Sequence, residues 1–572
     1  MGKIVRVDMS EGKARLEETP KSYANLAGRG LTSMIVGSEV PARCHALGRR
    51  NKLVIAPGAL TGTGAPNSGR LSIGCKSPLT EGIKESNVGG TPGHQLGRLG
   101  IDAVVLESLP QGDGLHLLHL SKRGAELIPC GEYKGLKNYE LVKKLQDRFG
   151  SKTSILSIGP VGEMKLSTAT VAATDTSGFP CRHAARGGPG AVMGSKGLKA
   201  VVIDDEGTAR VSAADPEKFK TGARRCTRAF KGNAFTQRLK DYGTSILVKG
   251  INSAGAFPTR NFREGYFKEV DRISGEHMKE LLAARGGKQS HAGCSTCIIR
   301  CSNVYVDEQG SYITSSLEYE TIWAHGANLG VADLDSIAWA DRLCDDYGMD
   351  TMEIGAAIGV AMDAGLKPFG DSQGALELLK EVGEGTPLGR ILGSGSWITG
   401  KVFGATRVPT VKRQAMAAYD PRGLHGMGVT YATSPMGADH TAGVMVHQNL
   451  DGELDPHKPD GQVDTCRQVQ IRLAAVDCTG LCLFANRPIF LNPEGLQGML
   501  EMMGARYGVV YTLDDFFALG RKVLRTEREF NLAAGMTRAD DRLPEFFKEE
   551  KIPPHNVAFT VEDEDLDRLF EF

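Results

Sequence analysis

The chain has 572 residues, more than one hydrophobic core usually spans, so we expect two to four domains. Its 68 Lys and Arg residues balance 68 Asp and Glu residues, and this zero net charge argues against a nucleic-acid partner. No apolar run approaches the roughly 18 residues of a membrane helix, and the start of the chain has no signal-peptide core. We therefore expect a cytoplasmic protein with no membrane span.

The first 208 residues are predicted to be rich in β-strands. Segment 3–18 alternates apolar and polar residues around a Ser-Glu-Gly turn, which is typical of a hairpin. Short apolar runs follow at 52–57, 101–107, 115–120 and 198–203. Glycine-dense loops separate these runs, and the 72 glycines of the chain are nearly twice the usual share of roughly 7%. Such loops allow the backbone to approach a ligand closely.

Helical patterning begins at about Ala213. Segments 215–230 and 333–348 show the periodicity of amphipathic helices, and similar patterns continue to the end of the chain. A second glycine-rich stretch, 419–443, interrupts them. We therefore predict an α+β fold in which a β-rich N-terminal domain, 1–208, is followed by two mainly α-helical domains, 209–418 and 419–572.

A short acidic pattern occurs twice, from Asp345 to Asp350 and from Asp477 to Cys482. Each copy ends a helix-like run with a glycine where a C-terminal cap would stand. In the first copy, Asp350 and Glu353 have the spacing of a capping box for the next helix. Each copy therefore brings an acidic side chain next to unpaired backbone groups.

Cysteine spacing is the strongest local signal for a metal site. The chain has 12 cysteines and no secretion signal, which favours thiols over disulfides. Cys294, Cys297 and Cys301 have C-x2-C-x3-C spacing. Zinc sites usually bring their thiols in two pairs, whereas an iron–sulfur cluster needs four, often with one remote. Candidates for the fourth are Cys478 and Cys482; zinc and three unligated buried cysteines are the alternatives.

Several long motifs then appear in a fixed order. They are the glycine-rich segments 57–79, 85–90 and 186–200, the three close cysteines, and the two copies of the acidic pattern. In this order they resemble the tungsten-dependent aldehyde:ferredoxin oxidoreductase family, from residue 1 to beyond residue 490. The resemblance implies that the N-terminal domain forms a base for a bis-pyranopterin tungsten cofactor, with two helical domains closing over it.

The resemblance also implies a set of cofactor-binding residues. Cys294, Cys297, Cys301 and Cys482 would hold one 4Fe-4S cluster. Asp345 and Asp477 would each accept the forked N–H donors of one pterin, because a carboxylate receives such a fork with two parallel bonds. Further pterin contacts would come from Asp350 and the backbone around Met349 and Leu481. The pterin phosphates would be bound through a magnesium ion and loop residues, for which the matching positions are Asn87, Gly89, Arg182 and His183. Arg70 would lie between cluster and pterin.

The family's tungsten has no side-chain ligand, so the protein supplies a pocket rather than a metal ligand. A glutamate and a histidine lie near the metal in this family. Glu320 matches the glutamate, with Glu318 as the second candidate, and His440 matches the histidine. The implied roles are a base, which takes a proton from water or the hydrated aldehyde, and a hydrogen-bond partner of the substrate carbonyl oxygen.

Some positions depart from the family. No histidine stands between His325 and His425, and Trp339 stands where a glutamate that bridges two subunits through an extra iron would be expected. Met436 replaces an arginine of many relatives. We therefore expect no bridging metal, while a homodimer or hetero-oligomer stays open.

The implied activity is the oxidation of aldehydes to carboxylic acids, with electrons passed through the cluster to ferredoxin or an iron–sulfur subunit. A catalytic subunit of benzoyl-CoA-reductase type is the alternative enzyme. A plain electron-transfer protein or cofactor carrier would need only the four cysteines, and would leave the paired aspartates and the glycine-rich loops without a role. Residue types do not distinguish tungsten from molybdenum.

Overall fold

A computed structural model describes residues 2–571. Its N-terminal part contains a mixed six-stranded sheet made of β1 (Lys3–Asp8), β2 (Lys13–Glu18), β3 (Leu53–Pro57), β4 (Leu71–Lys76), β5 (Ile83–Val88) and β6 (Ile101–Glu107). The strand order is β2-β1-β6-β3-β4-β5, and only β1 and β6 run parallel. The predicted hairpin is confirmed, because β1 pairs antiparallel with β2. β3 is buried along its whole length, which explains why it appears in the sequence as an unbroken apolar run. β4 is also buried throughout, although apolar residues alternate in it with Ser72, Gly74 and Lys76.

A second six-stranded sheet packs against the first. Its strands are β7 (His116–Ser121), β8 (Gly124–Pro129), β9 (Ser154–Ser157), β10 (Val171–Ala173), β11 (Arg182–Ala184) and β12 (Leu198–Asp204), in the order β11-β10-β9-β12-β7-β8. Apolar side chains from both sheets, such as Leu53 and Leu156, form one shared core. Helices cover the outer faces, α1 (Gly28–Glu39) on the first sheet and α3 (Asn138–Phe149) on the second. Between them α2 (Pro92–Arg98), α4 (Pro160–Glu163) and α5 (Pro189–Ser195) complete this part.

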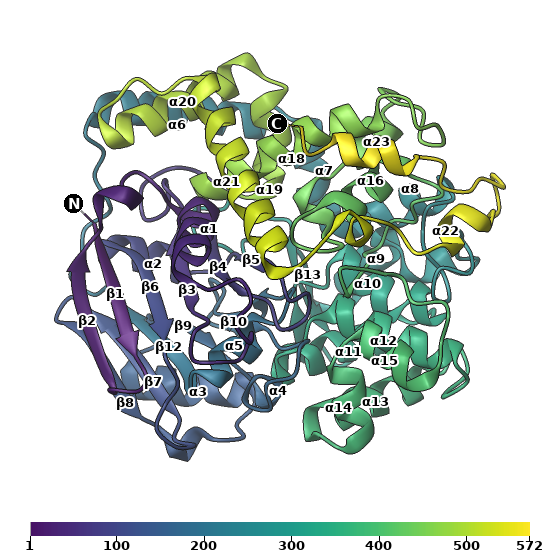
Figure 1. The fold of residues 1–572 in the computed structure, drawn as a ribbon, viewed down its shortest axis with the longest axis horizontal. Helices are drawn as coiled ribbons and strands as arrows, with labels where there is room; N and C mark the ends of the chain where they lie inside the picture. The colour runs from purple at the N-terminus through teal and green to yellow at the C-terminus, as the bar shows by residue number, and fades with distance from the viewer. Residues whose placement is uncertain (1, 572) are drawn as a thin grey trace.

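The rest of the chain is mainly helical, as predicted (Figure 1). Its first half contains α6 (Pro216–Lys231), α7 (Ala234–Tyr242), α8 (Leu247–Ser253), α9 (Gly275–Arg285), α10 (Tyr319–His325), α11 (Leu334–Tyr347), α12 (Thr351–Asp363), α13 (Ser372–Glu384), α14 (Pro387–Gly393) and α15 (Ser396–Phe403). Its second half contains α16 (His425–Thr433), α17 (Val446–Leu450), α18 (Gln462–Thr479), α19 (Leu483–Phe490), α20 (Pro493–Tyr507), α21 (Leu513–Ala534), α22 (Phe546–Glu549) and α23 (Asp563–Arg568). Two small sheets accompany them, β13 (Lys288–His291) with β14 (Ser302–Val306) and β15 (Tyr312–Ser315), and β16 (Thr410–Val411) with β17 (Gln414–Ala415).

The helical segments interlock with each other and with the sheets. α6 packs along α20, and α1 of the N-terminal part packs against both α18 and α21 (Figure 1). The α6–α20 contact crosses the predicted boundary at residue 418, so that boundary stays a prediction.

The acidic pattern ends two helices as expected. α11 stops before Gly348 and α18 before Gly480, and both glycines adopt left-handed φ angles, of +78° and +82°. Asp350 caps α12 through the Met352 N–H at 3.0 Å. The predicted capping box is wrong, because Glu353 instead accepts the N–H groups of Ser396 and Ala415.

The glycine-rich stretch 419–443 was predicted to interrupt the helices, but part of it is helical. It contains α16, in which every residue is buried. A helix surrounded by protein on all sides needs no polar face and therefore shows no amphipathic period.

No single helix between residues 2 and 571 has both the length and the hydropathy to cross a membrane. The consecutive helices α18 and α19, bent by 114° where they meet, reach those values only as a pair.

Candidate active site

One cavity of about 570 Å³ lies where the N-terminal sheets meet the helical segments. It brings together most of the residues that the sequence singled out, namely Arg70, Asn87, Gly89, Arg182, His183, Cys294, Cys297, Cys301, Glu318, Glu320, His440 and Cys482. Five others are not part of its lining: Asp345, Met349, Asp350, Asp477 and Leu481.

The four cysteines of the expected cluster line the same cavity. Burial, together with the nearby thiols of Cys294 and Cys482, raises the pKa of Cys297 to about 12. Within residues 2–571, no group of three or more His, Cys, Asp or Glu side chains is arranged to hold a single metal ion.

Cys482 and Cys478 have different surroundings, which separates the two candidates for the fourth cysteine. Cys482 precedes α19 and lines the cavity beside the three close cysteines. Cys478 lies within α18, is buried, and donates its thiol to the carbonyl of Ala474. Of Cys478 and Cys482, only Cys482 lines the cavity with Cys294, Cys297 and Cys301 and could bind the same cluster.

Asn67, which the sequence analysis did not single out, joins the two cysteine segments. Its carbonyl accepts the N–H of Cys482 at 3.0 Å. Its N–H donates to the carbonyl of Thr296, and its side-chain oxygen accepts the N–H of Ile298 at 2.8 Å. Asn67 has a left-handed φ of +54°, a conformation that asparagine tolerates better than most residues. It therefore fixes Cys482 relative to the loop of Cys294 and Cys297.

Gly89 is required where this loop meets the N-terminal domain. A Cβ at Gly89 would clash with the sulfur of Cys294 and lie 2.9 Å from Nη1 of Arg70. The absence of a side chain therefore lets Arg70 approach Cys294. The Nε of Arg70 is buried and has no hydrogen-bond partner in the described part of the chain.

Glu320 and His440 form a pair in the cavity, with side chains 18% and 12% exposed. Nε2 of His440 lies 3.3 Å from Oε1 of Glu320, and the hydroxyl of Tyr419 donates to the same oxygen at 3.2 Å. Burial favours the neutral acid, but the hydrogen bond and charge of His440, together with the hydrogen bond from Tyr419, outweigh it and lower the pKa of Glu320 below its ordinary value. Glu320 is thus held as a carboxylate, and Tyr419 is a third member of the group that sequence analysis missed.

Glu318, the second candidate, lies among other partners. Its carboxylate accepts the hydroxyls of Thr244 and Ser316, and Nη1 of Arg182 is 3.6 Å away. Its charge contributes to the raised pKa of the Cys301 thiol, behind burial as the main cause. Glu318 therefore lies on the cysteine side of the cavity, and His440 pairs with Glu320.

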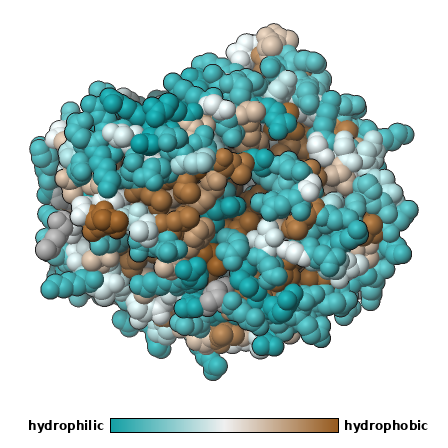
Figure 2. Space-filling model, turned by 90° about the horizontal axis from the view of Figure 1, so that it is seen from above, coloured by the Kyte–Doolittle hydropathy of each residue, from teal (hydrophilic) through white to brown (hydrophobic). Residues whose placement is uncertain are grey.

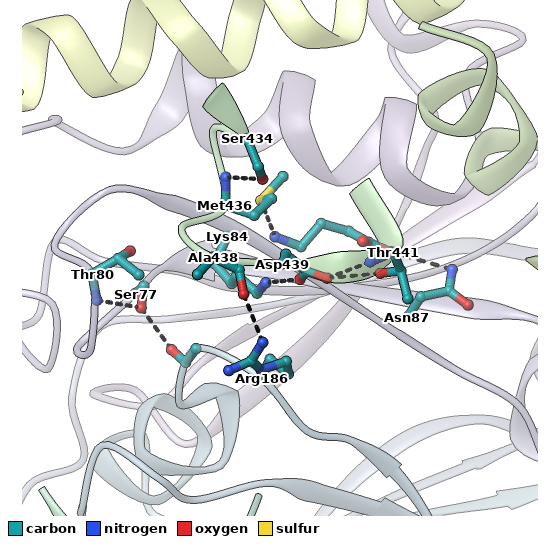
Figure 3. Close-up of polar contacts among 12 residues, drawn as sticks. Ser77, Thr80, Lys84, Asn87, Arg186, Ser434, Met436, Ala438, Asp439 and Thr441 are labelled. Carbon is teal, nitrogen blue, oxygen red and sulfur yellow. Dashed lines mark hydrogen bonds and ion pairs between the residues drawn. The ribbon is translucent and has the colours of Figure 1, made fainter. Parts of the chain in front are cut away.

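The loop that carries His440 is clamped by two cations of the N-terminal domain (Figure 3). Nζ of Lys84 donates to Oδ2 of Asp439 at 2.6 Å, and Lys84 is 1% exposed. Arg186 donates to the carbonyl of Ala438 at 2.7 Å and to that of Ala415 at 2.6 Å. Burial alone would raise the pKa of Asp439, but the charges of Lys84 and Arg186 lower it far below its ordinary value.

Met436, the departure noted in the sequence, lies in the same loop. Its sulfur accepts the backbone N–H of Glu85 at 3.1 Å, and its own N–H is held by Ser434 (Figure 3). Met436 therefore fastens the His440 loop to β5 by packing and a weak hydrogen bond.

Removing the Lys84 cation should destabilise the protein and displace His440. We expect Lys84→Met to lower the free energy of unfolding by about 3–5 kcal/mol, because it leaves Asp439 charged and buried without its partner. The loss should be present at neutral pH and shrink as pH falls through the lowered pKa of Asp439. Urea denaturation measures it.

The matched control is Lys367→Met, which removes a half-exposed lysine 3.4 Å from Glu377. An exposed pair contributes at most about 1 kcal/mol. Equal effects of the two substitutions would contradict a structural role for the Lys84 pair.

Asp345 does not line the cavity itself but contacts His183, which does. Oδ1 of Asp345 is 2.9 Å from Nε2 of His183, whose Nδ1 is 2.7 Å from the hydroxyl of Thr170. Arg182 instead reaches Ser302 and Ser316. Asn87 lies within 3.5 Å of the hydroxyl of Ser72 and 3.3 Å of Glu85.

Asp477 belongs to a largely buried group of acidic and basic side chains. Nη1 of Arg29 is 3.2 Å from Asp477, and Arg29 also makes two bonds to the buried Glu527. Burial and the nearby charge of Glu85 raise the pKa of Asp477 to about 7, against the opposing effect of Arg29. Arg29, Glu85 and Glu527 were not found by sequence analysis, because they are far from Asp477 along the chain.

Met349, Leu481 and Asp350 have partners inside the chain. The N–H of Met349 donates to the Cys344 carbonyl, and that of Leu481 donates to the Thr479 hydroxyl. The Asp350 carboxylate caps α12 and lies 3.4 Å from Arg186. Contacts from Met349 and Leu481 to a cofactor would therefore have to use their carbonyls or side chains.

The fold has a solved counterpart. The structure described as the active site complex BamBC of benzoyl coenzyme A reductase with 1,5-dienoyl-CoA matches with a TM-score of 0.80. The match covers 100% of this chain and 93% of the other, at 17% sequence identity. At that identity the likeness concerns the fold alone.

Curated relatives match almost the whole chain. The tungsten-containing aldehyde ferredoxin oxidoreductase of Thermococcus kodakarensis is 34% identical, over 96% of this chain and 92% of its own length. The enzyme of the same name from Pyrococcus furiosus is 33% identical over the same shares. A P. furiosus protein called aliphatic sulfonate oxidoreductase, WOR-like subunit, is 24% identical over 96% of this chain and 89% of its own length.

Two family models cover nearly all of the sequence. The model for the aldehyde ferredoxin oxidoreductase N-terminal domain matches residues 4–205, and the model for domains 2 and 3 of the same family matches residues 222–571. Sequence motifs, fold and relatives agree, and the chain belongs to the aldehyde ferredoxin oxidoreductase family.

Proposed function

We propose that this protein oxidises aldehydes to carboxylic acids at a bis-pyranopterin tungsten centre. The electrons would leave one at a time through a 4Fe-4S cluster to ferredoxin or an iron–sulfur partner subunit. The observation that carries the proposal is one cavity lined by the Glu320–His440 pair and by four cysteines. The names of the curated relatives support the substrate class and the metal.

The residues fit the pterin part of this cofactor. Asp477 is partly exposed, and burial with the nearby charge of Glu85 raises its pKa, so N–H donors of a ligand would stabilise its ionised form. Asp345 would serve the second pterin, next to His183. The phosphates and a bridging magnesium ion would lie at Asn87 and the loops of Gly89 and Arg182, where glycines leave backbone room for an anion.

The residues also fit a 4Fe-4S cluster. Cys294, Cys297, Cys301 and Cys482 offer four thiols around one cavity, the number that such a cluster takes. Arg70 adjoins Cys294 and has a buried Nε without a partner among residues 2–571. A guanidinium there would offset the negative charge of thiolate ligation and so would raise the reduction potential of a bound cluster.

When bound, the tungsten centre supplies the acceptor for two electrons. Conversion of an aldehyde and water to an acid releases two electrons and two protons, and the protein must take up the protons. The Glu320 carboxylate is the base that accepts a proton from water or from a hydroxyl of the hydrated aldehyde. Tyr419 and His440 hold that carboxylate in place.

The ring of His440 has one nitrogen left for the substrate. Its Nε2 faces Glu320, while its Nδ1 is buried and has no partner in the described chain. In a neutral ring with hydrogen on Nε2, Nδ1 accepts a hydrogen bond from a substrate hydroxyl.

We also propose a cytoplasmic location, which would keep the four thiols reduced. An electron-accepting partner would dock near the cysteines.

Trp339 is half exposed on α11, at the position where the family's bridging glutamate was expected.

Metal analysis and turnover test the function together. Protein purified without oxygen should hold about one tungsten and about four iron atoms per chain, and should reduce ferredoxin with simple aldehydes. Zinc, or iron without tungsten or molybdenum, would remove the catalytic proposal. Activity with benzoyl-CoA and none with aldehydes would favour the alternative of benzoyl-CoA-reductase type.

A further inference from the structure

A buried ion pair joins the N-terminal part of the chain to α21 outside the cavity. On the face of the molecule that includes α20, hydrophilic side chains cover most of the surface around a band of apolar ones (Figure 2). Glu527 departs from this pattern, because it lies on the buried side of α21 and is 0% exposed. Its partner, Arg29 of α1, is 2% exposed. Because a buried ion pair adds little net stability, a role other than stability is expected for this one.

Arg29 is held in one direction by its bonds to α21. Its Nε and Nη2 donate to the two carboxylate oxygens of Glu527 at 2.9 and 2.8 Å. Ser33, one turn further along α1, donates its hydroxyl to the same carboxylate at 2.7 Å. Two parallel bonds fix the plane of a guanidinium, so they also fix the direction of its third nitrogen. That nitrogen, Nη1, lies 3.2 Å from Oδ2 of Asp477.

The first turn of α1 fits closely against the segment that carries Asp477. A Cβ at Gly28 would clash with the carbonyl oxygen of Asp477, and one at Gly30 would lie 3.0 Å from Sγ of Cys478. Gly28 also has a left-handed φ of +50°. The two glycines therefore bring the Arg29 between them within reach of the Asp477 side chain.

Asp477 keeps one carboxylate oxygen available. Oδ2 faces Arg29, whereas Oδ1 accepts no hydrogen bond from residues 2–571, and the side chain is 22% exposed. Burial and the charge of Glu85 on β5 raise the pKa of this carboxyl, while Arg29 and, to a smaller extent, Arg70 lower it. Arg29 is therefore the main group that keeps Asp477 ionised.

We propose that Arg29, held by Glu527 and Ser33, is a positioning residue for pterin binding. Arg29 fixes the direction of the Asp477 carboxylate and keeps it charged, and a charged carboxylate accepts the forked N–H donors of a pterin with two bonds. Glu527 and Ser33 act through Arg29 alone. The inference rests on the proposed function and deepens it, because it makes residues of α1 and α21 part of the pterin site.

The rate at which the holoenzyme releases pterin and tungsten tests this role. Arg29→Met is combined with Glu527→Met, because removing one partner alone would leave the other charged and buried and could prevent folding. At about pH 7, in urea too dilute to unfold the protein, the double variant should release pterin about ten- to a hundredfold faster than the unmodified holoenzyme. The difference should shrink towards about pH 9, because Asp477 then ionises without Arg29. Adding Glu85→Gln should also slow the release, since it removes a charge that opposes ionisation.

Arg528→Met is the matched control. Arg528 follows Glu527 on α21 and donates to the buried Asp541 at 2.6 Å, so its loss breaks another ion pair of the same helix without touching Asp477. This variant should release pterin at the unmodified rate. Equal acceleration in both variants would overturn the inference. So would an acceleration that depends neither on pH nor on Glu85→Gln, because it would indicate a general loss of packing.

Failure of the proposed function would look different. If the unmodified protein holds pterin but oxidises no aldehyde, the activity is wrong, and the release rates still decide the role of Arg29. An unmodified protein that holds no pterin would overturn both the proposed function and this inference.

Discussion

Glu320→Gln is expected to lower kcat for aldehyde oxidation by about 10²- to 10⁴-fold while leaving tungsten and iron contents unchanged. Glutamine has the same shape and can still accept the hydrogen bond of Tyr419, so the cavity should keep its form. It cannot accept a proton, and the aldehyde and water would then lack their base. Steady-state kinetics with metal analysis of the same samples measures both parts of the expectation.

Glu318→Gln is the matched control, because Glu318 lies two residues away in the same cavity but binds Thr244 and Ser316 instead of His440. We expect its effect on kcat to be at least tenfold smaller. A larger loss with Glu318→Gln would transfer the role of the base to Glu318.

The pH profile should reflect the lowered pKa of Glu320. Because hydrogen bonds from His440 and Tyr419 outweigh burial and hold this pKa below its usual 4.5, the carboxylate persists above pH 4.5. Its pairing contributes stability above that pH and loses it as pH falls through the lower, folded-state pKa. The native enzyme could lose kcat between pH 7 and pH 5. If Glu320→Gln shows the same loss, titration of a group other than Glu320 causes it.

Cys482→Ser is expected to remove most of the bound iron and to abolish electron transfer to ferredoxin. Three cysteine thiolates would remain, and a 4Fe-4S cluster normally takes four. Iron and sulfide analysis, with electron paramagnetic resonance of the reduced protein, measures the loss. The native protein is expected to hold about four iron atoms per chain, and Cys482→Ser should hold clearly fewer.

Cys478→Ser provides the control in the same segment. Cys478 is buried, donates to Ala474 and does not line the cavity, so its replacement should keep the iron and cost about 1 kcal/mol of stability. Iron loss from Cys478→Ser with retention in Cys482→Ser would show that the fourth ligand was assigned to the wrong cysteine.

Local features of the sequence predicted the elements and the reactive residue types. The apolar runs became buried strands, and the acidic pattern ended α11 and α18 at left-handed glycines. Glu353 and α16 were exceptions. The buried carboxylate of Glu353 accepts N–H groups from residues distant in the sequence instead of forming the predicted capping box. The helix α16 is buried on all sides and therefore has no polar face to predict it by. Local sequence carries no information on such partners.

By itself, the sequence determined the family motifs, the order of a β-rich and a helical part, and the cysteines and acids that carry the proposed chemistry. Only the tertiary structure decided which of them meet. It placed Tyr419 beside Glu320, tied Cys482 to Asn67, and clamped the loop of His440 with Lys84. The physical reason is that these contacts join segments about a hundred to several hundred residues apart. Their geometry depends on how buried charges and polar groups are satisfied when those distant segments pack together.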